Sequence, residues 1–113
     1  MSEKNKTVRV FVSSPYTIGD SGENVRRQMD AGDILIDNGF TPLLPLLNHF
    51  WNIVSPTSYE TWLKWCFDWI DVCDCVLRLP GKSSGADREV KHALRQGKSV
   101  FTNIDDLITY YKK

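Results

Sequence analysis

Glu89 and the polar run before it are the residues best suited to chemistry. The run Gly81-Lys82-Ser83-Ser84-Gly85-Ala86-Asp87-Arg88 is rich in small side chains. Small residues let a backbone approach a ligand closely, and a helix that begins after Ser84 points free N–H groups at an anion. Arg88 can add a bidentate grip on a phosphate. The segment therefore predicts either an anion-binding turn or simply a helix start, capped by Ser84 and completed by Asp87.

Glu89 itself has two interpretations. It stands one turn into the expected helix, three residues after Ala86 and four before Ala93. Residues at these spacings share a helix face, so small side chains leave room for a ligand beside the carboxyl group. The alternative is an ordinary glutamate near the helix start, stabilised by the helix dipole.

A second set of polar residues, Ser13, Ser14 and Tyr16, follows a β-branched apolar stretch at 8–13. In an open parallel sheet, ligands bind beyond the carboxyl ends of the strands, so these hydroxyl groups can orient a sugar or a carboxylate. The alternative is a turn stabilised by Pro15, with Tyr16 on the surface.

The pattern of apolar and turn residues predicts the elements that position these groups. Strands are expected at 8–13, 40–44, 74–79 and 98–101, and helices from Ser21 or Asn24 up to Gly39 and at 58–73, 84–96 and 103–111. Strands and helices that alternate over short connections indicate parallel βαβ units. The expected fold is a single-domain α/β three-layer sandwich over residues 1–113. It is flavodoxin- or Rossmann-like, with a small parallel sheet of about four to five strands.

Composition limits the class of protein. The chain has 113 residues, 42% of them hydrophobic, which suits one domain with its own core. Its 14 basic and 14 acidic residues balance, and no Lys/Arg stripe follows a predicted helix, which argues against duplex nucleic acid as a partner. No apolar run approaches the roughly 20 residues that span a bilayer, so no membrane partner is expected.

The metal-ligating residue types are few and poorly spaced. The three cysteines, Cys66, Cys73 and Cys75, lack the spacing of a metal site, and so do His49 and His92. We therefore expect neither a metal nor a cofactor. An odd number of cysteines, with no hydrophobic signal segment before the first strand, indicates a reducing cytoplasm.

Aromatic residues are concentrated in two segments. The loop expected at 46–52 contains His49, which can donate a proton near neutral pH, and Trp51, which can stack on a base. The same residues would equally suit a dimer contact. The helix at 58–73 is apolar nearly all round and includes Trp62, Trp65 and Trp69. Such a helix lies in a core or between subunits, and we expect a homodimer through it.

Three phrases of the sequence resemble the nucleoside 2-deoxyribosyltransferase superfamily, and more narrowly its small, often phage-borne domains. They are Val12-Ser13-Ser14-Pro15-Tyr16-Thr17, Leu44-Pro45-Leu46-Leu47-Asn48-His49, and the run 73–90 with Ala93, Gly97 and Val100. The resemblance covers about residues 8–101. Its most specific part is S-x-G-x-x-x-E-x-x-x-A before a G-K strand.

The resemblance implies cleavage or transfer at the N-glycosidic bond of a (deoxy)nucleoside or its 5′-monophosphate. Glu89 matches the family's nucleophile, and a carboxylate suits attack on an oxocarbenium-like C1′. Tyr16 matches the tyrosine that orients it. Ser84 and Gly85 match positions that bind the 5′-phosphate in the related 2′-deoxynucleoside 5′-monophosphate N-hydrolases. The remaining residues expected to bind the substrate, some at the carboxyl ends of the strands, are Ser13, Asn48, His49, Trp51, Asp74 and Arg88.

One position departs from the family pattern. Cys66 stands where the resemblance implies an aspartate that protonates the leaving base or positions the sugar, and a thiol of ordinary pKa is a poor substitute. Asp68 lies about 200° around the helix from Cys66 and does not replace it. The departure keeps two alternatives to an enzyme open. One is a nucleotide-binding module without turnover, and the other is a subunit or adaptor whose tryptophan-rich surface is the function.

Overall fold

A four-stranded parallel sheet forms the centre of the protein. In a computed structural model that describes residues 7–112, the strands are β1 (Arg9–Ser13), β2 (Thr41–Leu43), β3 (Cys75–Arg78) and β4 (Ser99–Phe101). Their order is β2-β1-β3-β4, with every neighbouring pair parallel. Since β1 and β3 are the central strands, the residues that follow them lie side by side at one edge of the sheet.

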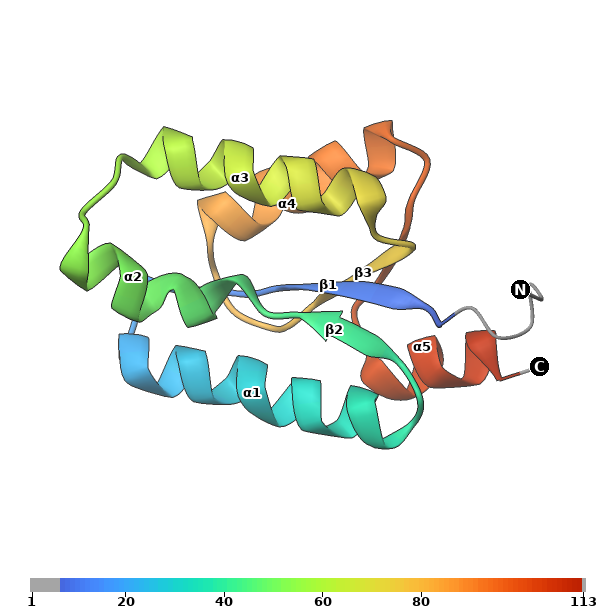
Figure 1. Ribbon diagram of the computed structural model, residues 1–113. Coiled ribbons are helices and arrows are strands. Elements are labelled where there is room, and N and C mark those ends of the chain that lie inside the picture. Colours follow the sequence, from blue (N-terminus) through green and yellow to red (C-terminus); the bar gives the residue numbers. More distant parts are fainter. Residues whose placement is uncertain (1–6, 113) are drawn as a thin grey trace.

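Helices cover both faces of the sheet (Figure 1). On one face lie α1 (Ser21–Asp37) and α5 (Ile104–Tyr111), and on the other lie α3 (Tyr59–Val72) and α4 (Ser84–Arg95). This arrangement confirms the predicted α/β three-layer sandwich with a small parallel sheet. No helix within residues 7–112 is long and apolar enough to cross a membrane.

Two apolar clusters fill the space between the sheet and its helices. Side chains alternate along β1, so Val10 and Val12 pack towards α1 and α5, whereas Phe11 packs towards α3 and α4. All three are fully shielded from solvent, as a central parallel strand should be. The same alternation makes Ser13, the last residue of β1, face α4.

The predicted helix starts are corrected at α1 and α4. Asp20 and Ser83 are the N-caps, in place of Ser21 or Asn24 and of Ser84. Each cap oxygen accepts a hydrogen bond from the backbone N–H three residues on, at 3.0 and 3.1 Å. Both caps have an extended backbone, which a side chain needs in order to reach back to the first helical turn.

The segment expected as an aromatic loop at 46–52 is helical instead. A 3-10 turn, η2 (Pro45–Leu47), leads into α2 (Asn48–Val54), which lies beyond the carboxyl ends of the strands (Figure 1). Pro45 suits the first position of a helical turn because its missing N–H has no partner there. Asn52 ties α2 to α3, since its Oδ1 accepts from Trp62 Nε1 at 2.8 Å and from Thr57 N at 3.0 Å.

Gln28, on the inner face of α1, joins two of the loops at this edge. Its Nε2 donates to Val12 O and to Ser14 Oγ, both at 2.9 Å, and its Oε1 accepts from Leu46 N at 3.1 Å. The side chain is completely buried. A buried amide whose hydrogen bonds are all made fixes the end of β1 relative to η2.

Gln28→Leu should therefore destabilise the protein. The substitution leaves buried backbone groups of Val12 and Leu46 without partners, at a cost of roughly 2–4 kcal/mol in the free energy of unfolding. Urea unfolding followed by circular dichroism measures this cost. Gln96→Leu, at an exposed position just after α4, is the matched control and should change the free energy by less than about 0.5 kcal/mol. Equal effects of the two variants would contradict the bridging role of Gln28.

Candidate active site

A cavity of about 310 Å³ opens beyond the carboxyl ends of β1 and β3. This volume lies at the lower end of the range for small-molecule sites. Four segments form its walls: the loop after β1, the η2–α2 segment, the first half of α3 and the first turns of α4. The lining residues are Ser14, Tyr16, Thr17, Ile18, Gln28, Pro45, Leu46, Asn48, His49, Asn52, Thr57, Tyr59, Trp62, Leu63, Cys66, Ser83, Ser84, Gly85, Ala86 and Glu89.

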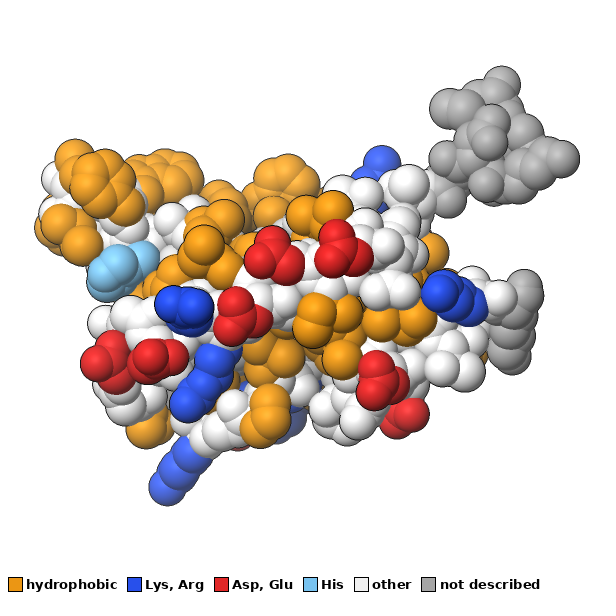
Figure 2. Space-filling model, turned by 90° about the horizontal axis from the view of Figure 1, so that it is seen from below, with side chains coloured by type: hydrophobic (Ala, Val, Ile, Leu, Met, Phe, Trp, Pro, Cys, Tyr) orange, Lys and Arg blue, Asp and Glu red, His pale blue; other side chains and the backbone are white. Residues whose placement is uncertain are grey.

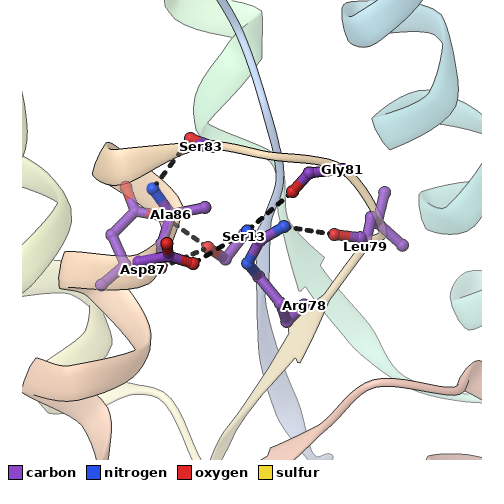
Figure 3. Close-up of polar contacts among 8 residues, drawn as sticks. Ser13, Arg78, Leu79, Gly81, Ser83, Ala86 and Asp87 are labelled. Carbon is purple, nitrogen blue, oxygen red and sulfur yellow. Dashed lines mark hydrogen bonds and ion pairs between the residues drawn. The ribbon is translucent and has the colours of Figure 1, made fainter.

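Glu89 is the one carboxyl group among these lining residues, and it is 9% exposed. Ser13 Oγ donates to Glu89 Oε1 at 2.7 Å and also lies 3.4 Å from Ala86 O. Ser13 points from the end of β1 towards the first turn of α4 (Figure 3). The role that the sequence assigned to Tyr16, holding the glutamate, therefore belongs to Ser13 in this structure.

Burial and hydrogen bonding act on Glu89 in opposite directions. Burial raises the pKa of the carboxyl group above its ordinary value. Hydrogen bonds from Ser13 and Cys66 and the positive charge of Arg78 favour the ionised form and offset part of this rise. The group thus remains a carboxyl that ionises at a higher pH than an exposed glutamate.

Cys66 faces Glu89 from α3. The thiol is buried, lines the cavity and is hydrogen-bonded to the glutamate. Burial and the neighbouring carboxylate raise the pKa of Cys66 far above that of an ordinary thiol, so it stays protonated at neutral pH. Cys66 is therefore a neutral donor to Glu89 and a weak acid for a leaving base.

Tyr16 and His49 form a polar pair on the opposite wall. The Tyr16 hydroxyl is hydrogen-bonded to His49 Nδ1, and the two rings meet edge to face with centroids 5.5 Å apart. Burial raises the pKa of Tyr16, which keeps its hydroxyl group protonated, so that it can donate to or accept from Nδ1 according to the protonation of His49. Asn24 holds the tyrosine loop by donating to Tyr16 O at 3.1 Å and Ile18 O at 3.0 Å. Asn48, beside His49, also lines the cavity.

The N-terminus of α4 forms the fourth wall. Ser84 and Gly85 both line the cavity. A Cβ atom at Gly85 would lie only 3.1 Å from Tyr59 Oη, so a side chain at this position would crowd the contact between α3 and α4. Asp87 does not complete a capping box, because its carboxylate binds Arg78 at 3.0 Å instead.

Arg78 is a residue that the sequence reasoning missed. It is the last residue of β3, and it donates to Leu79 O, to Gly81 O at 2.9 Å and to Asp87 (Figure 3). The signal was available: Arg78 is two residues after the buried Val76, and alternation places both on the α4 face of the strand.

Asp74 is not part of the cavity, so its predicted place there is wrong. It precedes β3 and therefore lies at the amino ends of the strands, the opposite edge of the sheet. Its Oδ2 accepts from Arg9 N at 2.7 Å, at the start of β1. The sequence-based prediction placed Asp74 at the site, but β3 runs from Asp74 towards the site, so Asp74 lies at the far end of the strand.

Arg88 and Trp51 also lie outside the lining residues. Arg88 points to α3, where its guanidinium binds Glu60 at 3.0 and 3.3 Å and lies over the ring of Tyr59. Trp51 packs edge to face on Trp62, with centroids 4.9 Å apart. The observed positions do not support the expectation that Arg88 binds a phosphate. They do not support the expectation that a base stacks on Trp51 either. Within residues 7–112, no group of three or more His, Cys, Asp or Glu side chains is arranged to hold a metal ion.

Two solved enzymes share this fold. A CMP N-glycosidase from Clostridium botulinum matches with a TM-score of 0.55 and 22% identity, over 81% of this chain and 65% of its own, so the chain spans less than two thirds of that enzyme. A 2-deoxyribosyltransferase from Bacillus psychrosaccharolyticus matches with a TM-score of 0.62 and 19% identity, over 93% of both chains. Both agree with the nucleoside 2-deoxyribosyltransferase-like fold expected from the sequence. No protein-family model matches the chain, and no curated protein matches it either.

Cys66→Asp should raise the pKa of Glu89. It replaces a neutral donor with a second carboxyl group, and two adjacent carboxyl groups resist ionising together, so the apparent pKa of the pair should rise by about 1–2 units. A ¹³C NMR titration of the glutamate carboxyl measures the shift. Cys66→Ser keeps a neutral donor and is the control. Equal titration curves for the Asp and Ser variants would show that residue 66 does not act on Glu89.

Proposed function

We propose that this protein cleaves or transfers at the N-glycosidic bond of a (deoxy)nucleoside or its 5′-monophosphate, with Glu89 as the nucleophile. The observation that carries the proposal is the buried Glu89 carboxyl in a cavity of about 310 Å³, held at 2.7 Å by Ser13. The fold is shared with two enzymes whose names state this chemistry, one an N-glycosidase and the other a deoxyribosyltransferase. That likeness supports the class of reaction but not the substrate.

Glu89 is suited to the chemical step. Its ionised oxygen attacks C1′, the bond from C1′ to the base nitrogen breaks, and the sugar becomes an ester of the glutamate. Water or a second base then attacks C1′ and releases Glu89 as the free carboxylate. Ser13 holds Oε1 throughout, so the second carboxylate oxygen is left for the sugar.

The leaving base needs a proton, and His49 is our candidate donor. An imidazolium ring can give up a proton, and His49 lines the same cavity as Glu89. In the protonated ring, Nδ1–H donates to the Tyr16 hydroxyl oxygen, which fixes the ring and leaves Nε2–H for the base. This pair takes over the task for which Cys66 is too weak an acid.

The N-terminus of α4 is our candidate site for the 5′ group of the sugar. Ser84 and Gly85 line the cavity at a point where helical N–H groups lack partners within the helix, which suits a phosphate or a hydroxyl group. Arg88 is not part of this proposal, because it is paired with Glu60. Asn48 is placed to contact the substrate from the α2 side.

A binding module without turnover is the second candidate function. The observation that favours it is Cys66, a protonated thiol in the position where the resemblance implies an acid. Such a module would use the same cavity to recognise a nucleotide, and Glu89 would then serve to bind the sugar.

We also propose that the protein is a homodimer through α3. Trp69 and Val72 are 44% and 57% exposed, and the rings of Trp62, Trp65 and Trp69 form a continuous edge-to-face series. Figure 2 shows hydrophobic side chains gathered at the end of the molecule where α2 lies, and Trp51 of α2 packs edge to face on Trp62 of α3. Aromatic residues in such numbers are typical of interfaces.

Light scattering coupled to gel filtration tests the dimer. The wild-type protein should have twice the chain mass of 13.0 kDa, and Trp69→Glu should reduce it to one chain by placing a charge in the interface. Met29→Glu, an exposed position of α1 on the other side of the sheet, is the control and should stay dimeric. A monomeric wild-type protein at high concentration would contradict the proposal.

Glu89→Gln should abolish the release of free base. The amide cannot form the glycosyl ester, so we expect a fall of at least about 10³-fold in rate. Chromatography of deoxynucleosides, ribonucleosides and their 5′-monophosphates, with and without acceptor bases, measures base release. In the wild type, release should increase with pH through the raised pKa of Glu89, because only the ionised carboxylate attacks C1′.

Glu23→Gln, an exposed substitution in the first turn of α1, is the control and should keep full activity. If no substrate releases base, while a nucleotide raises the melting temperature of the wild type and of Glu23→Gln, the binding module is correct. Release that persists in Glu89→Gln would contradict the assignment of the nucleophile.

A further inference from the structure

Arg78 is a largely buried cation that the proposed reaction leaves without a role. Its side chain is only 13% exposed. In the ladder between β1 and β3, Arg78 is the partner of Ser13, the residue that holds Glu89. Both side chains project from the ends of central strands towards α4 (Figure 3). A cation in this place is close to the reacting carboxyl group yet does not line the cavity.

The contacts of Arg78 span the loop that leads into α4. One guanidinium nitrogen donates to Leu79 O, and the other donates to Gly81 O at 2.9 Å and to Asp87 Oδ1 at 3.0 Å. The first two acceptors precede the Ser83 cap, and the third lies in the first turn of the helix. The planar guanidinium group, with donors in a fixed arrangement, bonds to the loop before Ser83 and to the helix after it at the same time. The single ammonium group of a lysine lacks this arrangement.

The loop itself has little freedom to adopt another shape. Gly81 has a φ of +121°, a conformation that other residues rarely adopt, and a Cβ atom there would lie 2.7 Å from Pro15 Cγ. Arg78 thus fastens a turn that requires glycine and that packs on the segment following β1. The same turn leads directly to Ser84 and Gly85, the proposed site for the 5′ group.

The charge of Arg78 also acts on Glu89. It lowers the pKa of the carboxyl group against the larger effect of burial. The other groups that face Glu89 are Ser13 from β1 and Cys66 from α3, and both are neutral. Asp87, on α4 itself, is paired with Arg78, while His49 and Tyr16 lie across the cavity. Arg78 is therefore the cation that favours the ionised nucleophile.

We propose that Arg78 is a positioning residue: its guanidinium fixes the loop that leads into α4, and its charge lies beside the end of β1 that holds Glu89, without touching the substrate. The inference rests on the proposed function. Two effects of Arg78 can be measured separately. Its hydrogen bonds to the loop affect substrate binding and therefore KM, whereas its charge affects the ionisation of Glu89 and therefore the pH dependence.

The test is the pH dependence of base release by Arg78→Gln and Arg78→Lys. Loss of the charge in Arg78→Gln should move the rising limb of kcat/KM to higher pH by about 1 unit. Arg78→Lys retains the charge, so the rising limb of its kcat/KM profile should stay near that of the wild type. The lysine loses the guanidinium hydrogen bonds to the loop, and this loss should raise KM several-fold. Lys91→Gln, an exposed charge removed from the same helix as Glu89, is the control and should match the wild type in both respects.

A folded Arg78→Gln protein with the pH profile and KM of the wild type would overturn the inference. If Arg78→Gln does not fold, Arg78→Lys decides: a KM equal to that of the wild type overturns the bonding role, and a raised KM with an unchanged limb supports it. If the wild type releases no base, the proposed function fails separately. A ¹³C NMR titration of Glu89 then tests the charge effect, with the same rise expected in Arg78→Gln and an unchanged pKa overturning it.

Discussion

The hydrogen bond from Ser13 to Glu89 is the contact on which the site depends. It joins the last residue of the central strand β1 to Glu89 in α4, and these two residues are 76 positions apart in sequence. Only the strand order β2-β1-β3-β4 brings them together, because it places β1 beside β3 and lets α4 return over both. The cavity, the loop after β3 and the position of Cys66 all follow from this crossing. A fold with β1 at an edge would leave Glu89 exposed and without this partner.

Burial and hydrogen-bond donors act in opposite directions on Glu89, and the proposed reaction depends on the balance between them. A fully solvated carboxylate would lose nucleophilicity to its hydration shell, whereas a buried one without donors would stay protonated. Ser13, Cys66 and the charge of Arg78 supply enough stabilisation of the anion to oppose the effect of burial. The replacement of an expected acid by Cys66 fits this balance, because a second carboxyl group would compete with Glu89 for ionisation. In the proposed reaction, the proton for the base comes from another part of the cavity, where Tyr16 and His49 meet.

Much of the fold follows from local patterns, but the partners within the site do not. Alternation and turn residues identified the four strands, and the placement of Glu89, Ser84 and Gly85 near the start of a helix followed from the turn before it. Asp74 was misplaced because it stands just before β3, at the amino ends of the strands, whereas the site lies at their carboxyl ends. The bonds of Gln28 and Arg78 could not be predicted, since each joins segments whose proximity only the assembled sheet creates. For the same reason the segment 46–52 was expected as a loop: its helical turns depend on contacts of Asn52 with α3.

The most direct test of this account is the mass of the protein during turnover. The protein is mixed with a substrate that it cleaves, quenched rapidly in acid, and analysed by intact mass and peptide mapping. We expect a fraction of the chains to gain one glycosyl unit, located on the peptide that contains Glu89, because the sugar is held there as an ester between the two steps. Free base that accumulates with the sugar attached to another residue would contradict the central role of Glu89.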